Sequence, residues 1–308
     1  MYPSESEPWT GSFVRDLAEA VGELGVDVEV LAFDGRRRAW NYATVLGKLR
    51  RAVRQGGFDL VHAHYGLTGM VALGQRRVPT IVTFHGSDTG NPRVRWQSWV
   101  SWVVARGATP VFVNREAARR LGRPNAAVIP AGVDTDLFRP RPREEARRAL
   151  GWPPGGTYVL LPGARANPDK GAPLFDAVVD LLRPDVPDLT AVSLEGFARA
   201  QVVDVMNAVD VTLMTSVFEG SPVSAKESLA CATPVVSVPV GDMPELLHGL
   251  PGCAVAPRDP ARLATAVSAA LAHGPDPALR HRAEQLSRTR IAERTVALYR
   301  DVLERSGR

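Results

Sequence analysis

The 308-residue sequence predicts an α/β protein made of two doubly wound domains, each with a parallel sheet between layers of helices. Three observations lead to this prediction. Short apolar runs alternate with amphipathic stretches along the whole chain, and the runs that read as strands fall into two equal groups. A segment rich in Pro, Arg and Gly, residues 138–156, separates the two groups.

The first half begins with a helical pattern. Phe13, Leu17, Val21 and Leu24 fall at helical spacing and predict an amphipathic helix. The strands predicted after it cover residues 26–33, 60–64, 80–84, 110–113 and 127–129.

The second half repeats the alternation. Its predicted strands cover residues 158–161, 189–194, 211–215, 235–238 and 253–256. Its predicted helices cover residues 172–182, 200–208, 223–232 and 261–272, and a long amphipathic helix covers 291–305. We therefore expect one domain at 1–145 and another at 156–289. The last helix, within 290–308, is expected to cross back onto the first domain.

The start of the chain is unusual for this fold class. A doubly wound domain normally opens with a central strand, and a ligand-facing loop follows it. Here the loop "MYPSESEPWTG" leads directly into the first helix. We therefore expect the first strand of the N-terminal sheet to be missing, either because the domain starts differently or because Met1 is an internal methionine of a longer sequence.

Composition describes an ordinary globular protein, with 45% hydrophobic and 23% charged residues. No apolar run is long enough to cross a membrane, and no signal peptide is recognisable, so a cytoplasmic protein is expected. Cys231 and Cys253 have no metal-binding spacing and read as buried thiols.

The charge is unevenly distributed along the chain. Residues 1–150 carry 22 Lys and Arg against 15 Asp and Glu, whereas residues 151–308 carry 15 against 18. No nucleic-acid-binding motif accompanies the basic half.

Two glutamates stand out in "FEGSPVSAKESLACATPVV". Glu219 is expected at the carboxyl end of a strand, where open α/β sheets bind ligands, and Glu227 on the helix that follows. Two carboxylates at that edge suit a ligand rich in hydroxyl groups, because each ionised oxygen accepts charge-assisted hydrogen bonds. The alternative is that both are solvated surface charges.

A basic pattern lies earlier, in "PGARANPDKGA". Gly163 and Arg165 follow a predicted strand, and Lys170 precedes a predicted helix. An arginine, a lysine and a helix N-terminus at one point would form an anion site suited to a diphosphate. Lys170 is a stronger candidate for this anion site than Arg165, because the chain has only three lysines, Lys48, Lys170 and Lys226.

Together, "GARANPDKG" and "EGSPVSAKE" resemble the retaining GT-B glycosyltransferases of family 4. In the N-terminal half, "GSFVRDLAEAVGELGVDVEVLAF", "FDLVHAH", "VTFHGSD" and "IPAGVDTDLFRP" match that family in order and spacing. The resemblance covers nearly the whole chain. It implies two Rossmann-like domains facing a cleft and transfer of a sugar, with retention, from a nucleoside diphosphate to an acceptor hydroxyl.

The resemblance also implies roles for residues of this chain. Arg165 and Lys170 would bind the donor diphosphate, Glu219 the donor sugar, and Glu227 the ribose. His85 of "HGSD" would lie near the donor sugar and the acceptor, with Glu219 and His85 as the catalytic pair, whereas His62 and His64 read as structural. Donor contacts are also expected from Gly163, Gly11, Gly220 and Ser221.

Two sequence features limit these expectations. Pro222 stands where the family often has a residue with a backbone N–H, so that donor contact cannot form here. Asp134 and Asp136 spell D-x-D, a metal motif of a different glycosyltransferase fold, but in this connection we expect no metal. No cofactor is expected either, because the nucleotide sugar is a substrate.

The expected partners are a nucleotide-sugar donor and a glycan, lipid-linked or small-molecule acceptor, in polysaccharide, glycolipid or cell-envelope glycan synthesis. An arginine cluster, consisting of Arg36, Arg37, Arg38, Arg50, Arg51 and Arg54, suggests peripheral association with an anionic inner membrane face. Three alternatives remain open: a non-catalytic binding or partner protein of the same fold, a truncated inactive form, and a nucleotide-sugar epimerase.

Overall fold

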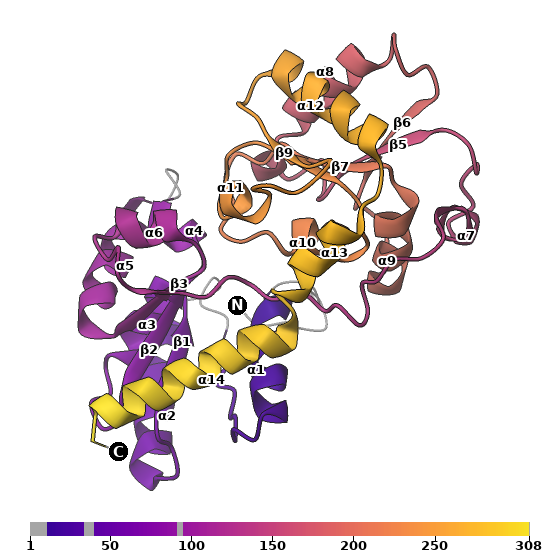
Figure 1. Cartoon of the computed structure of the whole chain (residues 1–308). Coiled ribbons are helices and arrows are strands. Elements are labelled where there is room, and N and C mark those ends of the chain that lie inside the picture. The colour runs from indigo at the N-terminus through magenta and orange to yellow at the C-terminus, as the bar shows by residue number, and fades with distance from the viewer. Residues whose placement is uncertain (1–10, 34–39, 91–94, 308) are drawn as a thin grey trace. The chain divides into compact units, whose positions relative to one another are not determined.

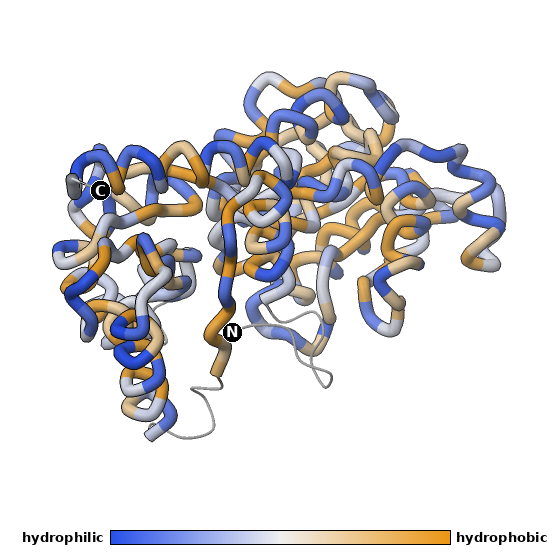
Figure 2. Tube along the Cα trace, turned by 90° about the horizontal axis from the view of Figure 1, so that it is seen from below, coloured by the Kyte–Doolittle hydropathy of each residue, from blue (hydrophilic) through white to orange (hydrophobic). Residues whose placement is uncertain are grey.

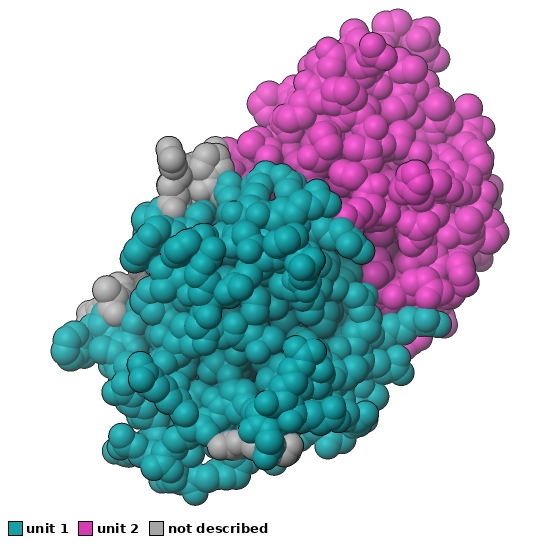
Figure 3. Space-filling model, turned by 60° about the vertical axis from the view of Figure 1, so that its left-hand side comes forward, with its two compact units in different colours: residues 1–132, 288–308 teal, residues 133–287 magenta. Residues whose placement is uncertain are grey.

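The computed structural model describes residues 11–33, 40–90 and 95–307. The chain divides into two compact units, which are coloured separately in Figure 3. Unit 1 comprises Met1–Gly132 and Arg288–Arg308, and unit 2 comprises Val133–Ser287. The division therefore falls at Gly132, before the segment 138–156 that the composition marks.

Unit 1 contains a parallel four-stranded sheet in the order β1-β2-β3-β4 (Figure 1). Its strands are β1 (Val61–His64), β2 (Thr80–Phe84), β3 (Thr109–Phe112) and β4 (Ala127–Val128). Its helices are α1 (Ser12–Glu23), α2 (Trp40–Gln55), α3 (Gly66–Ala72), α4 (Ser87–Gly90), α5 (Arg95–Gly107), α6 (Arg115–Arg120) and α14 (Arg288–Arg305).

The sheet of unit 1 is covered on both faces because successive side chains of a strand point to opposite sides. Val82 and Phe84 of β2 pack in one cluster with Val104 of α5. Ile81, which directly precedes Val82 in β2, packs on the other side with Val302 of α14. Apolar and polar residues alternate along the turns of α14, as Figure 2 shows, so its apolar side can cover the sheet.

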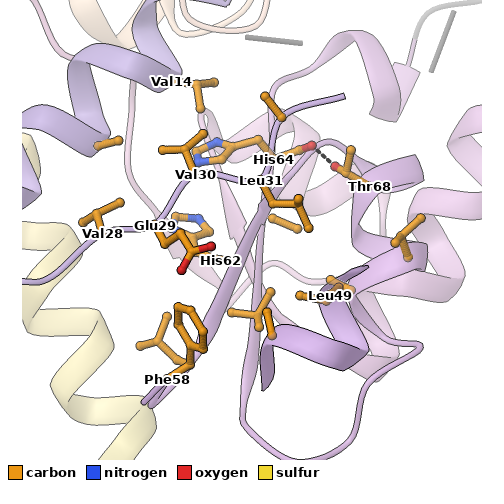
Figure 4. Close-up of a pocket in the computed structure, with 18 of the residues that line it drawn as sticks. Val14, Val28, Glu29, Val30, Leu31, Leu49, Phe58, His62, His64 and Thr68 are labelled. Carbon is orange, nitrogen blue, oxygen red and sulfur yellow. Dashed lines mark hydrogen bonds between the residues drawn. The ribbon is translucent and has the colours of Figure 1, made fainter. Parts of the chain in front are cut away.

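The strand predicted at residues 26–33 is wrong, because this segment forms no strand with any described residue. It is separated from β1 by a groove of about 450 Å³, lined by apolar side chains of both segments and of α1 (Figure 4). The backbone N–H groups of Val61 and Tyr65 donate to the carbonyls of Pro79, which directly precedes β2, and of Thr83 in β2. The intervening N–H groups of β1 therefore point to the other side, towards this groove. Val28 and Val30 are consequently exposed. Alternating apolar residues need a neighbouring strand to become a strand themselves, and none of the described residues supplies one.

Unit 2 contains a parallel five-stranded sheet in the order β6-β5-β7-β8-β9. Its strands are β5 (Thr157–Leu161), β6 (Leu189–Ser193), β7 (Val211–Met214), β8 (Val235–Ser237) and β9 (Ala254–Val255). Its α-helices are α7 (Arg143–Ala149), α8 (Ala172–Leu182), α9 (Arg199–Ala208), α10 (Val223–Ala230), α11 (Met243–Leu246), α12 (Pro260–His273) and α13 (Pro277–Glu284). A 3₁₀ turn, η2, covers Pro168–Lys170.

The unit 2 sheet lies between two helical layers, with α8 and α12 on one face and α9, α10 and α13 on the other (Figure 1). Leu160 of β5 belongs to the core cluster that includes α9 and α10, whereas its neighbour Leu161 belongs to the cluster with α8 and α12. The central strands β5, β7 and β8 are buried on both faces, which explains why they read as continuous apolar runs rather than alternating ones.

The segment before β5 belongs to unit 2 because α7 packs on α9 and carries a buried arginine. The Arg147 guanidinium lies 2.8 Å from Asp210 Oδ2, and the same oxygen accepts a 2.7 Å hydrogen bond from the backbone N–H of Tyr158. This long-range network is not visible in the composition of the segment. It accounts for the position of the division ahead of residues 138–156.

Candidate functional site

The loops that follow β5 and β7 meet at the carboxyl edge of the unit 2 sheet, because both strands are parallel neighbours. Here Lys170 Nζ lies 2.8 Å from Glu219 Oε1. The Ser216 hydroxyl donates a 2.8 Å hydrogen bond to the same oxygen. The structure thus brings the predicted lysine and the first predicted glutamate into direct contact.

Hydrogen bonds hold the two loops against each other. The Thr215 hydroxyl donates to the Lys170 carbonyl at 2.9 Å, and the Val217 N–H donates to the Asp169 carbonyl at 2.8 Å. The Arg258 guanidinium donates to the carbonyls of Thr215 and Ser216 at 2.9 and 2.6 Å. Sequence reasoning missed Arg258, which acts on backbone atoms from a distant loop.

Two glycines permit this close packing. A Cβ at Gly163 would lie 2.7 Å from the aliphatic stem of Lys170, so the bare backbone leaves room for that side chain. Gly171 has φ +68°, and a Cβ there would lie 2.1 Å from the Thr215 carbonyl oxygen. Gly163 therefore supports Lys170 through packing, whereas its predicted contact with a ligand remains a prediction.

Arg165 lies apart from the contact between Lys170 and Glu219. Its Nη2 atom pairs with both carboxylate oxygens of Asp176 on α8, at 2.5 and 2.6 Å. Both side chains are exposed, and an exposed ion pair is worth only about 0–1 kcal/mol, so this contact can be exchanged for another at little cost.

Glu227 is buried and its Oε1 lies 2.6 Å from Arg199 Nη1 on α9. The Arg199 guanidinium carbon lies 4.6 Å from the centre of the Phe138 ring. The second predicted glutamate is thus held by an arginine that sequence reasoning missed. Its position at the start of α9, 28 residues upstream of Glu227, gave no signal of this pairing.

A second ionic cluster includes Ser221 and Lys226, which follow Glu219 in the chain. Lys226 of α10 is fully buried, and its Nζ lies 3.0 Å from Asp242 Oδ2. The hydroxyl of Ser221 donates a 2.5 Å hydrogen bond to that oxygen and also contacts Lys226 Nζ. Asp242 Oδ1 is buried without a hydrogen-bond partner among the described residues. Ser221, predicted to contact a ligand, is here bound into the structure, and the only sequence signal for the cluster was the rarity of lysine.

Lys226→Met is expected to lower the free energy of unfolding by about 3–5 kcal/mol, because it leaves the buried Asp242 carboxylate without its cation. Urea unfolding measures this change. The double variant Lys226→Met/Asp242→Leu removes both charges, and we expect it to recover most of the loss. Equal losses in the single and double variants would contradict the ion-pair explanation.

His85 follows β2 in unit 1 and is half-buried. Its Nε2 lies 3.0 Å from His64 Nδ1, and its ring contacts those of Phe13 and Tyr65 at centroid distances of 4.8 and 4.6 Å. The backbone N–H of His85 donates to the Asp88 carboxylate at 3.0 Å, which fixes the turn after β2. His64, which the sequence led us to interpret as structural, thus contacts the predicted catalytic histidine.

Burial controls the protonation of this histidine cluster. It lowers the pKa of His62 to about 4 and that of His85 to about 3, and lowers the pKa of His64 well below its ordinary value. The neighbouring His62 also lowers the pKa of His64 and His85. These rings are therefore neutral near pH 7 and can each offer one hydrogen-bond donor and one acceptor.

The same shifts predict acid sensitivity. Below about pH 6.5 the unfolded chain binds more protons at these histidines than the folded chain does, so stability is lost as the pH falls towards about 4. Burial raises the pKa of Asp88 to about 6, and this carboxyl acts in the opposite direction below that pH. The urea concentration at the unfolding midpoint should decrease as the pH is lowered from 7.5 to 5. This decrease should be smaller in His64→Asn than in the parent protein. His281→Asn, at an exposed position, is the matched control and should follow the parent protein.

The remaining predicted sites have local roles. Gly11 caps α1 with φ +73° and accepts the Val14 N–H through its carbonyl. Asp134 Oδ1 accepts hydrogen bonds from the backbone N–H groups of Asp136 and Leu137, at 3.1 and 2.9 Å, and so closes a turn. Of the arginine cluster, Arg36, Arg37 and Arg38 lie outside the described residues, and Arg50, Arg51 and Arg54 lie on α2.

Residues 11–33, 40–90 and 95–307 contain neither a cluster of metal ligands nor a membrane-spanning helix. Within them, no three His, Cys, Asp or Glu side chains are grouped so as to hold a metal ion. No helix in the same set combines the length and apolar character needed to cross a membrane.

Comparisons with known proteins identify the family. Residues 10–137 match the family model described as Glycosyltransferase Family 4, and residues 171–273 match the model described as Glycosyl transferases group 1. The chain belongs to glycosyltransferase family 4. The first match covers unit 1 from residue 10 to Gly132 and continues to residue 137 of unit 2, and the second match lies within unit 2, so both units carry family features.

Curated relatives of this glycosyltransferase include two D-inositol 3-phosphate glycosyltransferases. The protein from an Arthrobacter species is 28% identical over 247 residues, which cover 64% of the chain and 58% of that relative. The protein from Thermobispora bispora is 28% identical over 313 residues, which cover 81% of the chain and 72% of that relative. The chain thus spans between about half and three quarters of the length of these relatives.

Solved structures agree on the fold of this glycosyltransferase. Sucrose-phosphate synthase from Thermosynechococcus elongatus superposes with a TM-score of 0.77 at 20% identity, covering 98% of the chain and 96% of that structure. HepE from Anabaena, in complex with UDP and glucose, gives 0.71 at 16% identity, covering 96% and 97%. The two Rossmann-like units therefore form a GT-B glycosyltransferase fold.

Proposed function

We propose that this glycosyltransferase transfers a sugar from a nucleoside diphosphate sugar to an acceptor hydroxyl, in the synthesis of a polysaccharide, glycolipid or cell-envelope glycan. The observation that carries the proposal is the contact between Lys170 and Glu219 at the carboxyl edge of the unit 2 sheet. It places a cation suited to a diphosphate beside a carboxylate suited to sugar hydroxyls.

Three neighbouring features support donor binding by unit 2. Arg165 is held by an exposed ion pair with Asp176 and by a contact of 6.0 Å with the Phe175 ring, and it can turn to a phosphate. The 11-residue helix α8 begins directly after η2 and Gly171, and the N-terminus of a helix favours anions. Glu227 is buried in the helix that follows the Glu219 loop, and we assign it to the ribose. Since HepE is described with UDP and glucose, UDP sugars are the first donors to test.

For the reaction we propose front-face displacement with retention. The bond between the anomeric carbon and the diphosphate oxygen breaks while the acceptor oxygen bonds to that carbon on the same face. The departing phosphate oxygen takes the acceptor proton, and Lys170 and Arg165 stabilise the charge that develops on the diphosphate. Glu219 binds donor hydroxyls and forms no covalent bond. The neutral His85 ring contributes a hydrogen bond to a substrate hydroxyl.

The experiment is a thermal-shift and hydrolysis screen of nucleoside diphosphate sugars without added acceptor. A true donor should raise the melting temperature further as its concentration increases. It should also be hydrolysed slowly, because water can replace the acceptor. A protein that neither responds to any donor nor hydrolyses it would be a non-catalytic member of the family. Conversion of a donor into its epimer without release of free sugar would identify an epimerase instead.

A further inference from the structure

Helix α5 in unit 1 exposes three of the chain's six tryptophans. The exposed fractions are 58% for Trp96, 65% for Trp99 and 43% for Trp102, and Val103 between them in the helical turn is 37% exposed. Large exposed apolar side chains are ordinary when scattered, but a group on one helix marks an interaction surface.

These four residues form one continuous stripe, which we call the α5 tryptophan stripe. Trp99, Trp102 and Val103 follow Trp96 by three, six and seven residues. Because an α-helix turns about 100° per residue, all four side chains lie within an arc of about 120° around the helix axis. The stripe ends at Arg106, whose guanidinium carbon lies 3.5 Å from the centre of the Trp102 ring. The exposed face of α5 is therefore made of indoles and terminated by a cation.

The opposite face of α5 is locked against the sheet. Ser101, Val104 and Ala105 are fully buried. A Cβ at Gly66 of α3 would lie 2.1 Å from Ser101 Oγ, and one at Gly69 would lie 2.7 Å from Val104 Cγ1, so α5 sits directly on the bare backbone of α3. Rotation of α5 to hide the tryptophans would break this packing, and the stripe remains at the surface.

The side chains of the stripe and the charge of unit 1 indicate which kind of partner the stripe would bind. Indole prefers the boundary between apolar chains and water, where its ring is buried and its N–H stays hydrated. Neither α3 nor α5 contains an acidic residue, and unit 1 as a whole carries 23 Lys and Arg against 14 Asp and Glu. A basic body with an indole stripe complements an anionic lipid surface.

We propose that the α5 tryptophan stripe docks unit 1 on an anionic lipid bilayer, with the indoles at the level of the headgroups. The docking surface is α5, whereas Arg50, Arg51 and Arg54 of the arginine cluster lie on α2. Helix α4 begins two residues after His85 and packs on α5. Docking would therefore hold the His85 turn near the bilayer, which suits an acceptor hydroxyl carried by a lipid. The docking itself does not depend on the proposed transfer activity.

The test is co-sedimentation of the full chain with phosphatidylglycerol-containing vesicles and with phosphatidylcholine vesicles, together with tryptophan emission. We expect binding to the anionic vesicles with a blue shift and with quenching by brominated acyl chains. The double variant Trp96→Ser/Trp99→Ser should bind about tenfold more weakly, since interfacial affinity follows the apolar area inserted. Its melting temperature should be unchanged, because both side chains are exposed.

Trp40→Ser is the matched control, because Trp40 is 77% exposed and lies at the start of α2. It should bind vesicles like the parent protein. A loss of binding in Trp40→Ser but not in the α5 double variant would overturn the assignment to α5. Failure of the parent protein to bind anionic vesicles at low salt would overturn lipid docking and leave a protein partner for the stripe.

Discussion

Replacing Lys170 by methionine is expected to lower kcat for sugar transfer by about 100- to 1,000-fold, the usual effect of removing one group that stabilises charge in the transition state. Methionine retains an unbranched apolar stem for the space beside Gly163, so the change removes the charge rather than the packing. The effect should appear in kcat more than in KM, because the charge on the diphosphate grows as the glycosidic bond breaks. Initial rates with the donor found in the screen measure it.

The matched control is Arg148→Met, which removes a positive charge from the exposed side of α7. It should leave the rate within about twofold of the parent protein, since surface charges far from a site act weakly through water. A Lys170→Met rate as high as that of Arg148→Met would show that Lys170 is only a structural partner of Glu219. The melting temperature of Lys170→Met separates a catalytic loss from unfolding.

Glu219→Gln is the second change with a large expected effect, and we expect a loss of kcat of about 100-fold or more. The amide keeps the size and one acceptor oxygen of the carboxylate but loses its charge. It should therefore bind sugar hydroxyls weakly and no longer hold Lys170 at 2.8 Å. Because the Ser216 hydroxyl can still donate to the remaining oxygen, the loop itself should stay folded.

The double variant Lys170→Met/Glu219→Gln tests whether the two side chains act as one unit. If they do, the double variant should be little slower than the slower single variant, because each single change already disables the pair. Fully multiplicative losses would mean independent roles. A trapped glycosyl adduct on Glu219, found by mass spectrometry, would contradict front-face displacement.

Much of the fold could be read from periodicity, because strands and helices of a doubly wound protein are local patterns. Helix α8 coincides with its prediction at 172–182, and α1 differs by one residue from the stretch at 13–24. The segment 26–33 has the composition of a strand but does not form one. Whether this segment forms a strand depends on an adjacent strand with which it can pair. The alternation of residues within the segment does not show whether such a strand exists.

The candidate site, like the fold, could be predicted from the sequence only in part. Lys170 and Glu219 were found from sequence because each follows a strand whose parallel neighbour ends at the same edge. The partners of the other candidates were not found. Arg199 beside Glu227, and Lys226 with Asp242 beside Ser221, come from elements whose approach depends on how helices pack over the sheet.

The sequence by itself determined the family, the two parallel sheets and the positions of the strand-end residues that define the candidate site. These follow from short-range spacing, which is written directly in the order of residues. The tertiary structure alone decided where the two units divide, which charged side chains pair, and which tryptophans remain exposed on α5. These depend on contacts between distant segments, and the free energy of such contacts comes from the burial and packing of the assembled core rather than from any local pattern.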